Sequence, residues 1–272
     1  MRLARVEYQG HVRAADFDGE DYRLAPAAGE DPLLDALRSG IPPEFGDAVP
    51  GSDVTVLAPL RRPGKIVAIG LNYADHTAET GLDAPSEPLT FAKYPTSITG
   101  PGSEIRVPRE LTTQVDWEAE LAVVIGAECG PERRGTPSRI GYFTVANDVS
   151  ARDLQFGDKQ WTRGKSLDTF CPLGPLLVTP DEVPEPEALR IWATVNGVVM
   201  QDATTADLIF GLAELLDSIT AGVTLEPGDV VLTGTPPGVG GFRTPPVFLQ
   251  DGDVVEVGVD GIGTLRNPVR WV

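Results

Sequence analysis

The stretch VDWEAELAVVIG, residues 115–126, places three acidic residues directly before an apolar run. Asp116, Glu118 and Glu120 occupy alternate positions, and in a β-strand residues two apart point to the same face, roughly 6–7 Å from each other. On this spacing alone, a half-exposed strand whose acidic side meets water is the simpler explanation. The continuation LAVVIG is too apolar for such an edge and predicts a core strand with carboxylates at its head.

Carboxylates at the margin of a core need a partner, because two like charges placed there are costly unless they are neutralised. A hard divalent cation such as Mg²⁺ or Mn²⁺ would do this, since both prefer oxygen ligands. A third ligand could be Asp148, at the polar end of the next predicted strand in YFTVANDVSARDLQ, residues 142–155. A turn, or a cap on a helix over residues 151–155, is the alternative role for Asp148.

The rest of the chain predicts many short strands and few helices. Asn196-Gly197 is a strong signal for a type I′ hairpin, and residues 205–222, TADLIFGLAELLDSITAG, predict the one long helix. Regular alternation of strands and helices, as a Rossmann fold requires, is absent from the sequence pattern. Further strands are expected at residues 65–70, 115–126, 142–149, 188–202, 228–233 and 253–259. We therefore predict an α+β fold that is predominantly β.

The first 60 residues resemble a separate small unit. Short strands joined by Gly and Asp turns are followed by DPLLDALRSG, a predicted helix that ends at Gly40. A Pro- and Gly-rich connector, IPPEFGDAVPGSD, comes next. These features predict a small N-terminal domain over residues 1–60 and a larger domain over residues 61–272.

Composition excludes several functions. The chain has 272 residues and a formal net charge of −18, with 40 acidic against 22 basic residues. Nucleic acids and anionic membranes both need a basic surface, so neither is an expected partner. The first residues lack the apolar run of a signal peptide, and no stretch approaches the ~20 residues of a membrane span. A cytoplasmic protein is expected, with Cys129 and Cys171 as buried free thiols.

Familiar catalytic motifs are incomplete. RGKS at residues 163–166 lacks the glycine that a phosphate-binding loop needs, because Lys159 stands at that position. Neither a GxSxG turn nor an HExxH helix occurs, and the chain has only two histidines. These observations disfavour serine hydrolases, nucleotide-binding enzymes and HExxH-type metalloproteases.

Two further groups of residues are candidates for catalysis. The chain has four lysines beside eighteen arginines, and Lys165 lies in QWTRGKSLDTFCPLGP, a mixture typical of a pocket wall. Ordinary scatter of the four lysines remains an alternative. His76 and Glu79 in NYADHTAETG would share one face of a helix. They could form a general base with its orienting carboxylate, or an incidental surface pair.

Six segments together resemble one known family. GLNYADHTAE, VDWEAELAVVIG, ANDVSARDLQ, QWTRGKS, LTGTPPGVG and GIGTLRNPV occur in this order. They are similar to the fumarylacetoacetate hydrolase superfamily, in its bacterial branch of acylpyruvases and 2-hydroxyhepta-2,4-diene-1,7-dioate isomerases. The resemblance covers residues ~63–272 and implies a mixed β-sandwich roll, usually a homodimer. Gly164 and Leu167 stand where Ala and Phe are frequent, which affects the expected shape of the pocket rather than its chemistry.

The resemblance also implies a set of site residues. Mg²⁺ or Mn²⁺ would be bound by Glu118, Glu120 and Asp148. His76 and Glu79 match a catalytic pair carried on a lid, and Lys165 matches the active-site lysine. Contacts to the substrate carboxylate are implied for Arg152, Gln155 and Thr235.

The implied substrate is an anionic 2-oxo or 2,4-dioxo acid. The reaction expected first is hydrolysis of a carbon–carbon bond in an acylpyruvate, with His76 activating water and a pyruvate enolate leaving. Decarboxylation of an oxaloacetate-like acid and keto–enol isomerisation in aromatic catabolism are the alternatives. A non-catalytic binding protein of the same fold is less expected, because His76, Glu79 and Lys165 are all present. A two-metal phosphoesterase would usually need more His or Asp ligands.

Overall fold

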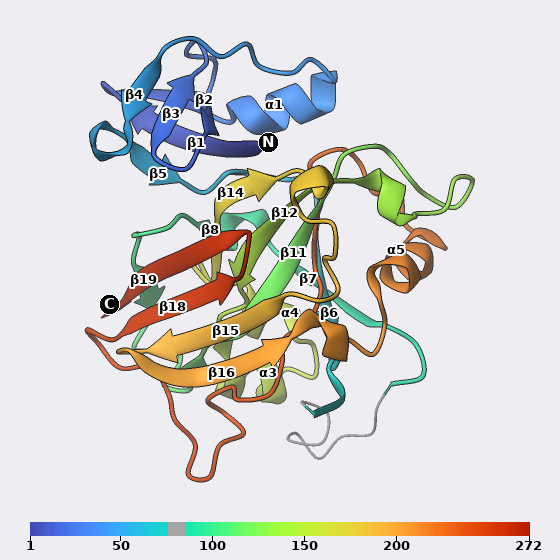
Figure 1. Ribbon diagram of the computed structural model, residues 1–272. Helices are drawn as coiled ribbons and strands as arrows, with labels where there is room; N and C mark the ends of the chain where they lie inside the picture. Colours follow the sequence, from blue (N-terminus) through green and yellow to red (C-terminus); the bar gives the residue numbers. More distant parts are fainter. Residues whose placement is uncertain (76–84) are drawn as a thin grey trace.

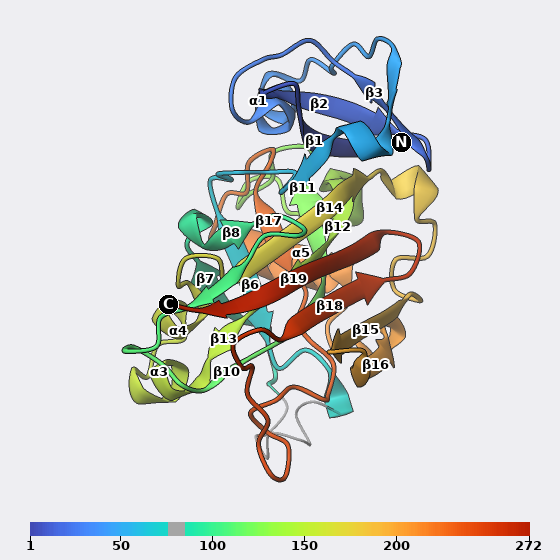
Figure 2. The ribbon, with the colours of Figure 1, turned by 90° about the vertical axis from the view of Figure 1, so that its left-hand side faces the viewer.

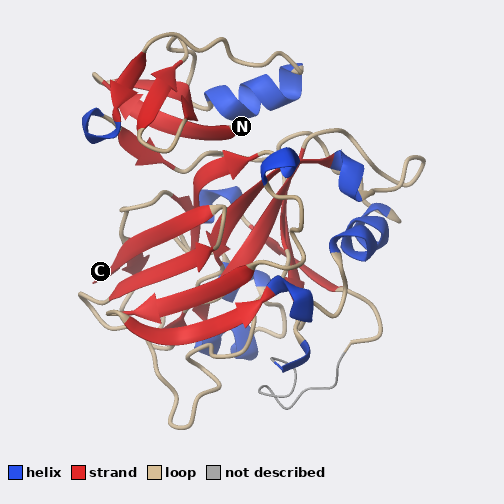
Figure 3. Cartoon of the chain, in the orientation of Figure 1, coloured by secondary structure: helices blue, strands red, loops and turns tan. Residues whose placement is uncertain are grey.

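The computed structural model describes residues 1–75 and 85–272, and two packed sheets dominate it (Figures 1 and 3). The larger sheet has twelve strands, ten of them in the order β4-β3-β2-β1-β14-β12-β11-β17-β6-β7, with β5 beside β1 and β8 beside β14. Its strands are β1 (Arg2–Tyr8), β2 (His11–Phe17), β3 (Asp21–Leu24), β4 (Ala48–Pro50), β5 (Thr55–Leu57), β6 (Ile66–Gly70), β7 (Leu89–Lys93), β8 (Ile98–Thr99), β11 (Ala119–Ile125), β12 (Ile140–Asn147), β14 (Cys171–Val178) and β17 (Val230–Leu232). The predicted α+β fold with a predominance of strands is confirmed.

The second sheet has five strands in the order β16-β15-β18-β19-β9, and its strands cross over those of the larger sheet (Figure 2). They are β9 (Ile105–Val107), β15 (Arg190–Val195), β16 (Val198–Thr204), β18 (Val254–Val259) and β19 (Gly263–Trp271). A short ladder joins β10 (Val115–Asp116) to β13 (Ser150–Ala151). Among the described residues the helices are α1 (Pro32–Ser39), α3 (Arg152–Gly157), α4 (Thr162–Lys165) and α5 (Leu212–Thr220), with 3-10 turns at Gly51–Asp53, Pro95–Ser97, Pro137–Arg139, Pro180–Glu182 and Thr205–Asp207.

Strand β11 lies in the middle of the molecule, and all seven of its residues are buried. It pairs antiparallel with β12 on one side and with β17 on the other. Leu121 and Val123 face the cluster that contains the second sheet, while Ala122 and Val124 belong to the cluster on the opposite face. A strand covered on both faces needs apolar residues at every position, which explains the unbroken run LAVVI.

The predicted hairpin is present where β15 meets β16. Val195 pairs with Val198, and Asn196 and Gly197 have φ angles of 52° and 78°. Both central residues therefore have the left-handed backbone that a type I′ turn requires.

The long helix predicted over residues 205–222 is shorter than expected, since α5 begins only at Leu212. Asn72 explains the difference, because it engages the chain just before the helix. The N–H of Ile209 donates to the carbonyl oxygen of Asn72, and the N–H of Phe210 donates to its side-chain Oδ1. These tertiary bonds hold residues 209–210 out of the helix, so periodicity overestimated its length.

The N-terminal unit, shown in blue in Figure 1, is continuous with the larger sheet. Strand β1 pairs antiparallel with β14, at Arg2 with Val178 and Leu3 with Leu177. Leu33 and Leu34 of α1 lie in the same buried cluster as Ala122 and Val124 of β11. The boundary at residue 60 stays a prediction. Within the described ranges, no helix is long and apolar enough to cross a membrane.

Candidate active site

Three carboxylates meet where β11 begins and β12 ends. The two strands are antiparallel, so the head of one lies beside the tail of the other. The backbone N–H of Asp148, just after β12, donates to the carbonyl oxygen of Glu118 at 2.9 Å. Glu118, Glu120 and Asp148 each offer an oxygen within 4.8 Å of the others. The structure thus brings together the three residues that were candidate metal ligands on the basis of the sequence.

These three side chains are almost completely enclosed, with Glu120 and Asp148 at most 1% exposed. Desolvation, followed by the charges of Asp148 and Glu118, raises the pKa of Glu120 well above its usual value. A group of oxygen ligands that repel one another in a buried place is chemically suited to a hard divalent cation. The donor set therefore fits Mg²⁺ or Mn²⁺.

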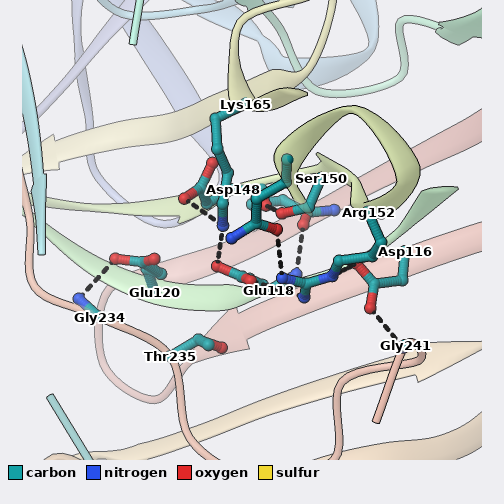
Figure 4. Close-up of polar contacts among 12 residues, drawn as sticks. Asp116, Glu118, Glu120, Asp148, Ser150, Arg152, Lys165, Gly234, Thr235 and Gly241 are labelled. Atoms are coloured by element: carbon teal, nitrogen blue, oxygen red, sulfur yellow. Dashed lines mark hydrogen bonds and ion pairs between the residues drawn. The ribbon is translucent and has the colours of Figure 1, made fainter. Parts of the chain in front are cut away.

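Lys165 contacts two members of this group, as Figure 4 shows. Its Nζ donates to Glu118 Oε2 at 2.6 Å and to Asp148 Oδ2 at 2.9 Å. Burial by itself lowers the pKa of Lys165, but the charges of Asp148 and Glu118 outweigh it and raise the pKa. Gly164 lets α4 approach this closely, because a Cβ there would lie 2.7 Å from the backbone N of Gln155. The absence of a side chain at Gly164 thus has a steric reason.

Arg152 is fixed by partners on three sides. Its Nε donates to Asp116 Oδ1 at 2.8 Å, and one terminal nitrogen donates to Gln155 Oε1 at 2.9 Å. The other terminal nitrogen lies 2.6 Å from Glu118 Oε1 as an ion pair. Asp116 and Glu118 therefore share one buried arginine, although Asp116 belongs to β10 and lies outside the three-carboxylate group.

Two residues that sequence reasoning did not select also hold the site. Lys93, at the end of β7, donates from Nζ to Asp148 Oδ1 at 2.5 Å and to the carbonyl oxygen of Lys165. Gln201, in β16, accepts from the N–H of Ala119 and donates to Thr235 Oγ1 at 2.8 Å. The scarcity of lysines was a signal for Lys93, but nothing local distinguished it from the others. No pattern pointed to Gln201.

A pocket opens beside these groups, and Glu118, Arg152, Gln155, Lys165 and Thr235 line its polar side. Aromatic and aliphatic side chains form the remaining walls. Phe91 and Trp161 make an edge-to-face pair with ring centroids 5.4 Å apart, and Phe156 and Phe242 make another at 6.0 Å. Lys165 Nζ lies 5.3 Å from the centroid of Phe91, and Arg152 Cζ lies 5.5 Å from that of Phe242. Each cation of the pocket thus faces an aromatic ring.

The charges of the site do not balance within the described residues. Four buried carboxylates (Asp116, Glu118, Glu120 and Asp148) face three buried cations (Lys93, Arg152 and Lys165). When all seven groups are ionised their net charge is −1. A bound divalent cation would make the net charge of the site +1. Such a site would attract an anion inside an acidic protein. His76 and Glu79, the predicted catalytic pair, lie outside the described residues.

Comparison with known proteins gives consistent matches. Residues 65–270 match the family model described as fumarylacetoacetate hydrolase, C-terminal. The bovine mitochondrial oxaloacetate tautomerase FAHD2A is 50% identical over 225 residues, which cover 81% of this chain and 71% of that protein. The solved fumarylacetoacetate hydrolase of Exiguobacterium antarcticum matches with a TM-score of 0.90 and 36% identity over all of both chains. The 2-hydroxyhepta-2,4-diene-1,7-dioate isomerase of Mycobacterium marinum matches with a TM-score of 0.81 and 37% identity, over 100% of this chain and 98% of the other.

Proposed function

This chain belongs to the fumarylacetoacetate hydrolase family, and on that premise we propose that it is a metal-dependent enzyme that interconverts the keto and enol forms of an oxaloacetate-like 2-oxo acid. The observation that carries the proposal is the buried group of Glu118, Glu120 and Asp148, which lies against Lys165 and reaches the pocket through Glu118. The name of the half-identical bovine relative supports the choice of reaction.

Glu118, Glu120 and Asp148 would hold Mg²⁺ or Mn²⁺. When bound, the ion withdraws electron density from a 2-oxo carboxylate and makes the proton on C3 more acidic. Arg152, Gln155 and Thr235 are the proposed contacts for the substrate carboxylate, since all three line the pocket. The guanidinium of Arg152 offers the planar pair of donors that suits a carboxylate.

Lys165 is suited to act on the 2-oxo oxygen of the substrate. Its Nζ lines the pocket, and as an ammonium, the ordinary form of lysine near neutral pH, it can stabilise negative charge on the 2-oxo oxygen. It can then donate a proton to that oxygen as the enol forms. The proton that leaves C3 needs a different acceptor, and His76 oriented by Glu79 is the pair that the family resemblance offers.

Hydrolysis of an acylpyruvate, the reaction expected first from the sequence, is the second candidate. The aromatic pairs Phe91–Trp161 and Phe156–Phe242 favour it, because these walls suit an acyl substituent better than the second carboxylate of oxaloacetate. Keto–enol exchange needs no attacking water, whereas hydrolysis also requires a positioned one.

The test is a set of ultraviolet assays with protein loaded with Mg²⁺ or Mn²⁺. Oxaloacetate, acetylpyruvate, fumarylpyruvate and 2-hydroxyhepta-2,4-diene-1,7-dioate would be compared, with pyruvate measured separately. We expect faster decay of the oxaloacetate enol without matching release of pyruvate, and loss of this activity when EDTA removes the metal. Pyruvate release from acetylpyruvate, with no effect on the oxaloacetate enol, would replace the tautomerase proposal with hydrolysis.

A further inference from the structure

Asp116 is a fully buried carboxylate that lies outside the pocket wall and outside the group of proposed metal ligands. Its two oxygens have different partners. Oδ1 accepts from Arg152 Nε at 2.8 Å, and Oδ2 accepts from the backbone N–H of Gly241 at 2.6 Å (Figure 4). One side chain thus connects the arginine of the pocket to the loop that follows β17.

That loop lies against Asp116 and Arg152 because two successive residues lack a Cβ. A Cβ on Gly240 would lie 2.8 Å from the Cβ of Asp116. One on Gly241 would lie 3.1 Å from Arg152 Cγ and 3.3 Å from Asp116 Oδ2. The next residue, Phe242, places its ring against the Arg152 guanidinium. The backbone of the loop and the arginine are therefore packed as one unit around Asp116.

A guanidinium binds a carboxylate well only when its plane is oriented before the ligand arrives. Gln155 and Glu118 contact the two terminal nitrogens of Arg152, whereas Asp116 alone among the described residues accepts from Nε. Asp116 thus binds the guanidinium at Nε, the nitrogen nearest the Arg152 backbone, and leaves the two terminal nitrogens at the pocket.

We propose that Asp116 is a positioning residue for substrate binding: it orients Arg152 and fixes the Gly240–Phe242 loop, so that an incoming carboxylate meets a preset guanidinium. The inference rests on the proposed function in taking Arg152 as a substrate contact. A merely structural Asp116–Arg152 pair would instead affect folding and every property of the site together.

The experiment compares Asp116→Ala, Asp116→Asn, Arg152→Ala and the double variant Asp116→Ala/Arg152→Ala with Asp202→Ala, which breaks an exposed Asp–Arg pair. The measurements are KM and kcat for oxaloacetate, the Kd of oxalate with Mn²⁺ present, and Mn²⁺ affinity without oxalate. We expect Asp116→Ala to raise KM and the oxalate Kd about tenfold or more while kcat and Mn²⁺ affinity change little.

Non-additivity makes this test specific. If Asp116 acts through Arg152, adding Asp116→Ala to Arg152→Ala should change the oxalate Kd by less than about twofold. Asp116→Asn keeps one acceptor oxygen and should give a smaller loss than Asp116→Ala. Unchanged KM in Asp116→Ala, additive losses in the double variant, or a parallel fall in Mn²⁺ affinity would each overturn the proposal.

A second route avoids replacing a buried charge. Gly241→Ala alters only the partly exposed loop, yet its new Cβ would press on Arg152. We expect a rise of several-fold in the oxalate Kd at unchanged thermal stability, and an unchanged Kd would count against the inference even if Asp116→Ala failed to fold. If Arg152→Ala left the oxalate Kd unaltered, the substrate contact under the proposed function would be wrong as well, which separates the two failures.

Discussion

Two kinds of ion pair occur in this molecule at nearly equal distances. Lys165 lies 2.6 Å from Glu118 in the site, with side chains 2% and 6% exposed. On β15 and β16, Arg190 lies 2.7 Å from Asp202, with side chains 50% and 48% exposed. The similar distances do not imply similar energies. The charges of the outer pair remain largely hydrated, whereas those of the inner pair have lost almost all contact with water.

Two carboxylates, one from each region, differ in the direction of their pKa in the same sense. At the surface, the hydrogen bond from Arg190 lowers the pKa of Asp202. In the site, desolvation dominates and raises the pKa of Glu120 despite the nearby Lys165. Proximity of a cation therefore does not decide the state of an acid by itself. The carboxylates of the site repel one another in a place that water does not reach. The variants below test how metal binding and stability depend on this buried group compared with the surface pair.

The largest effect is expected from Glu118→Ala and Glu120→Ala. Each removes one of the three proposed oxygen donors, and because outer-shell changes alone weaken metal sites by about 10–100-fold, we expect Mn²⁺ binding to be lost from the range of calorimetry. Activity should disappear with it. Asp202→Ala is the control with an equal change of charge, and an unaltered Mn²⁺ affinity in Glu118→Ala would remove the metal assignment.

Lys93→Met should cost the most stability. It leaves Asp148 Oδ1 and the carbonyl oxygen of Lys165 without this donor in a fully enclosed place. Breaking a buried pair from one side typically lowers the free energy of unfolding by about 3–5 kcal/mol. Urea denaturation of the metal-free protein measures this, with Arg190→Met as the surface counterpart. Equal midpoints for the two variants would mean that burial does not separate these ion pairs.

Gln201→Leu tests a buried polar group without a charge. Its loss removes partners from the N–H of Ala119, the hydroxyl of Thr235 and the carbonyl of Pro236. Each unsatisfied buried group of this kind lowers the free energy of unfolding by about 1–3 kcal/mol. The destabilisation by Gln201→Leu should therefore be smaller than that by Lys93→Met and larger than that by Asp202→Ala. Differential scanning calorimetry can rank the three, and a loss larger than that of Lys93→Met would contradict the order.

Asp202→Ala should have the smallest effect, with a urea midpoint indistinguishable from that of the parent protein near neutral pH. The lowered pKa of Asp202 also gives the sign of its pH dependence. Its small contribution is present above the pKa of the unfolded chain and is lost as the pH falls through the lower folded value. Parent and variant should therefore converge in acid, and divergence there would contradict this assignment.

Local patterns predicted the parts of the molecule that depend on neighbours in sequence. The apolar run that follows Glu118 and Glu120, and the polar end of the next strand at Asp148, made these residues candidate ligands, and the family resemblance implied the same set. The antiparallel pairing of β11 and β12 explains why the three positions lie together. Asn196-Gly197 predicted its turn from backbone conformation alone.

What was missed depends on partners far away in the chain. Lys93 bonds to Asp148, 55 residues later, and Gln201 bonds to Ala119, 82 residues earlier. The start of α5 was wrong because Asn72 occupies the preceding backbone donors from a distance of 138 residues. Asp116 received no role from the sequence because its partner Gly241 comes 125 residues later. Such pairings follow from the topology of the fold, and they produce no periodic pattern in the sequence around either partner.

The continuity between the N-terminal unit and the central sheet bears on how the chain tolerates being cut. A fragment of residues 65–270 would lose β1 from the side of β14 and α1 from the buried cluster around Ala122 and Val124. A bare strand edge beside an uncovered apolar face is the surface on which other copies assemble into aggregates. Proteolytic cleavage in the connector at residues 41–53, followed by release of the N-terminal piece, would therefore threaten the solubility of the remaining fragment, although every proposed site residue would still be present.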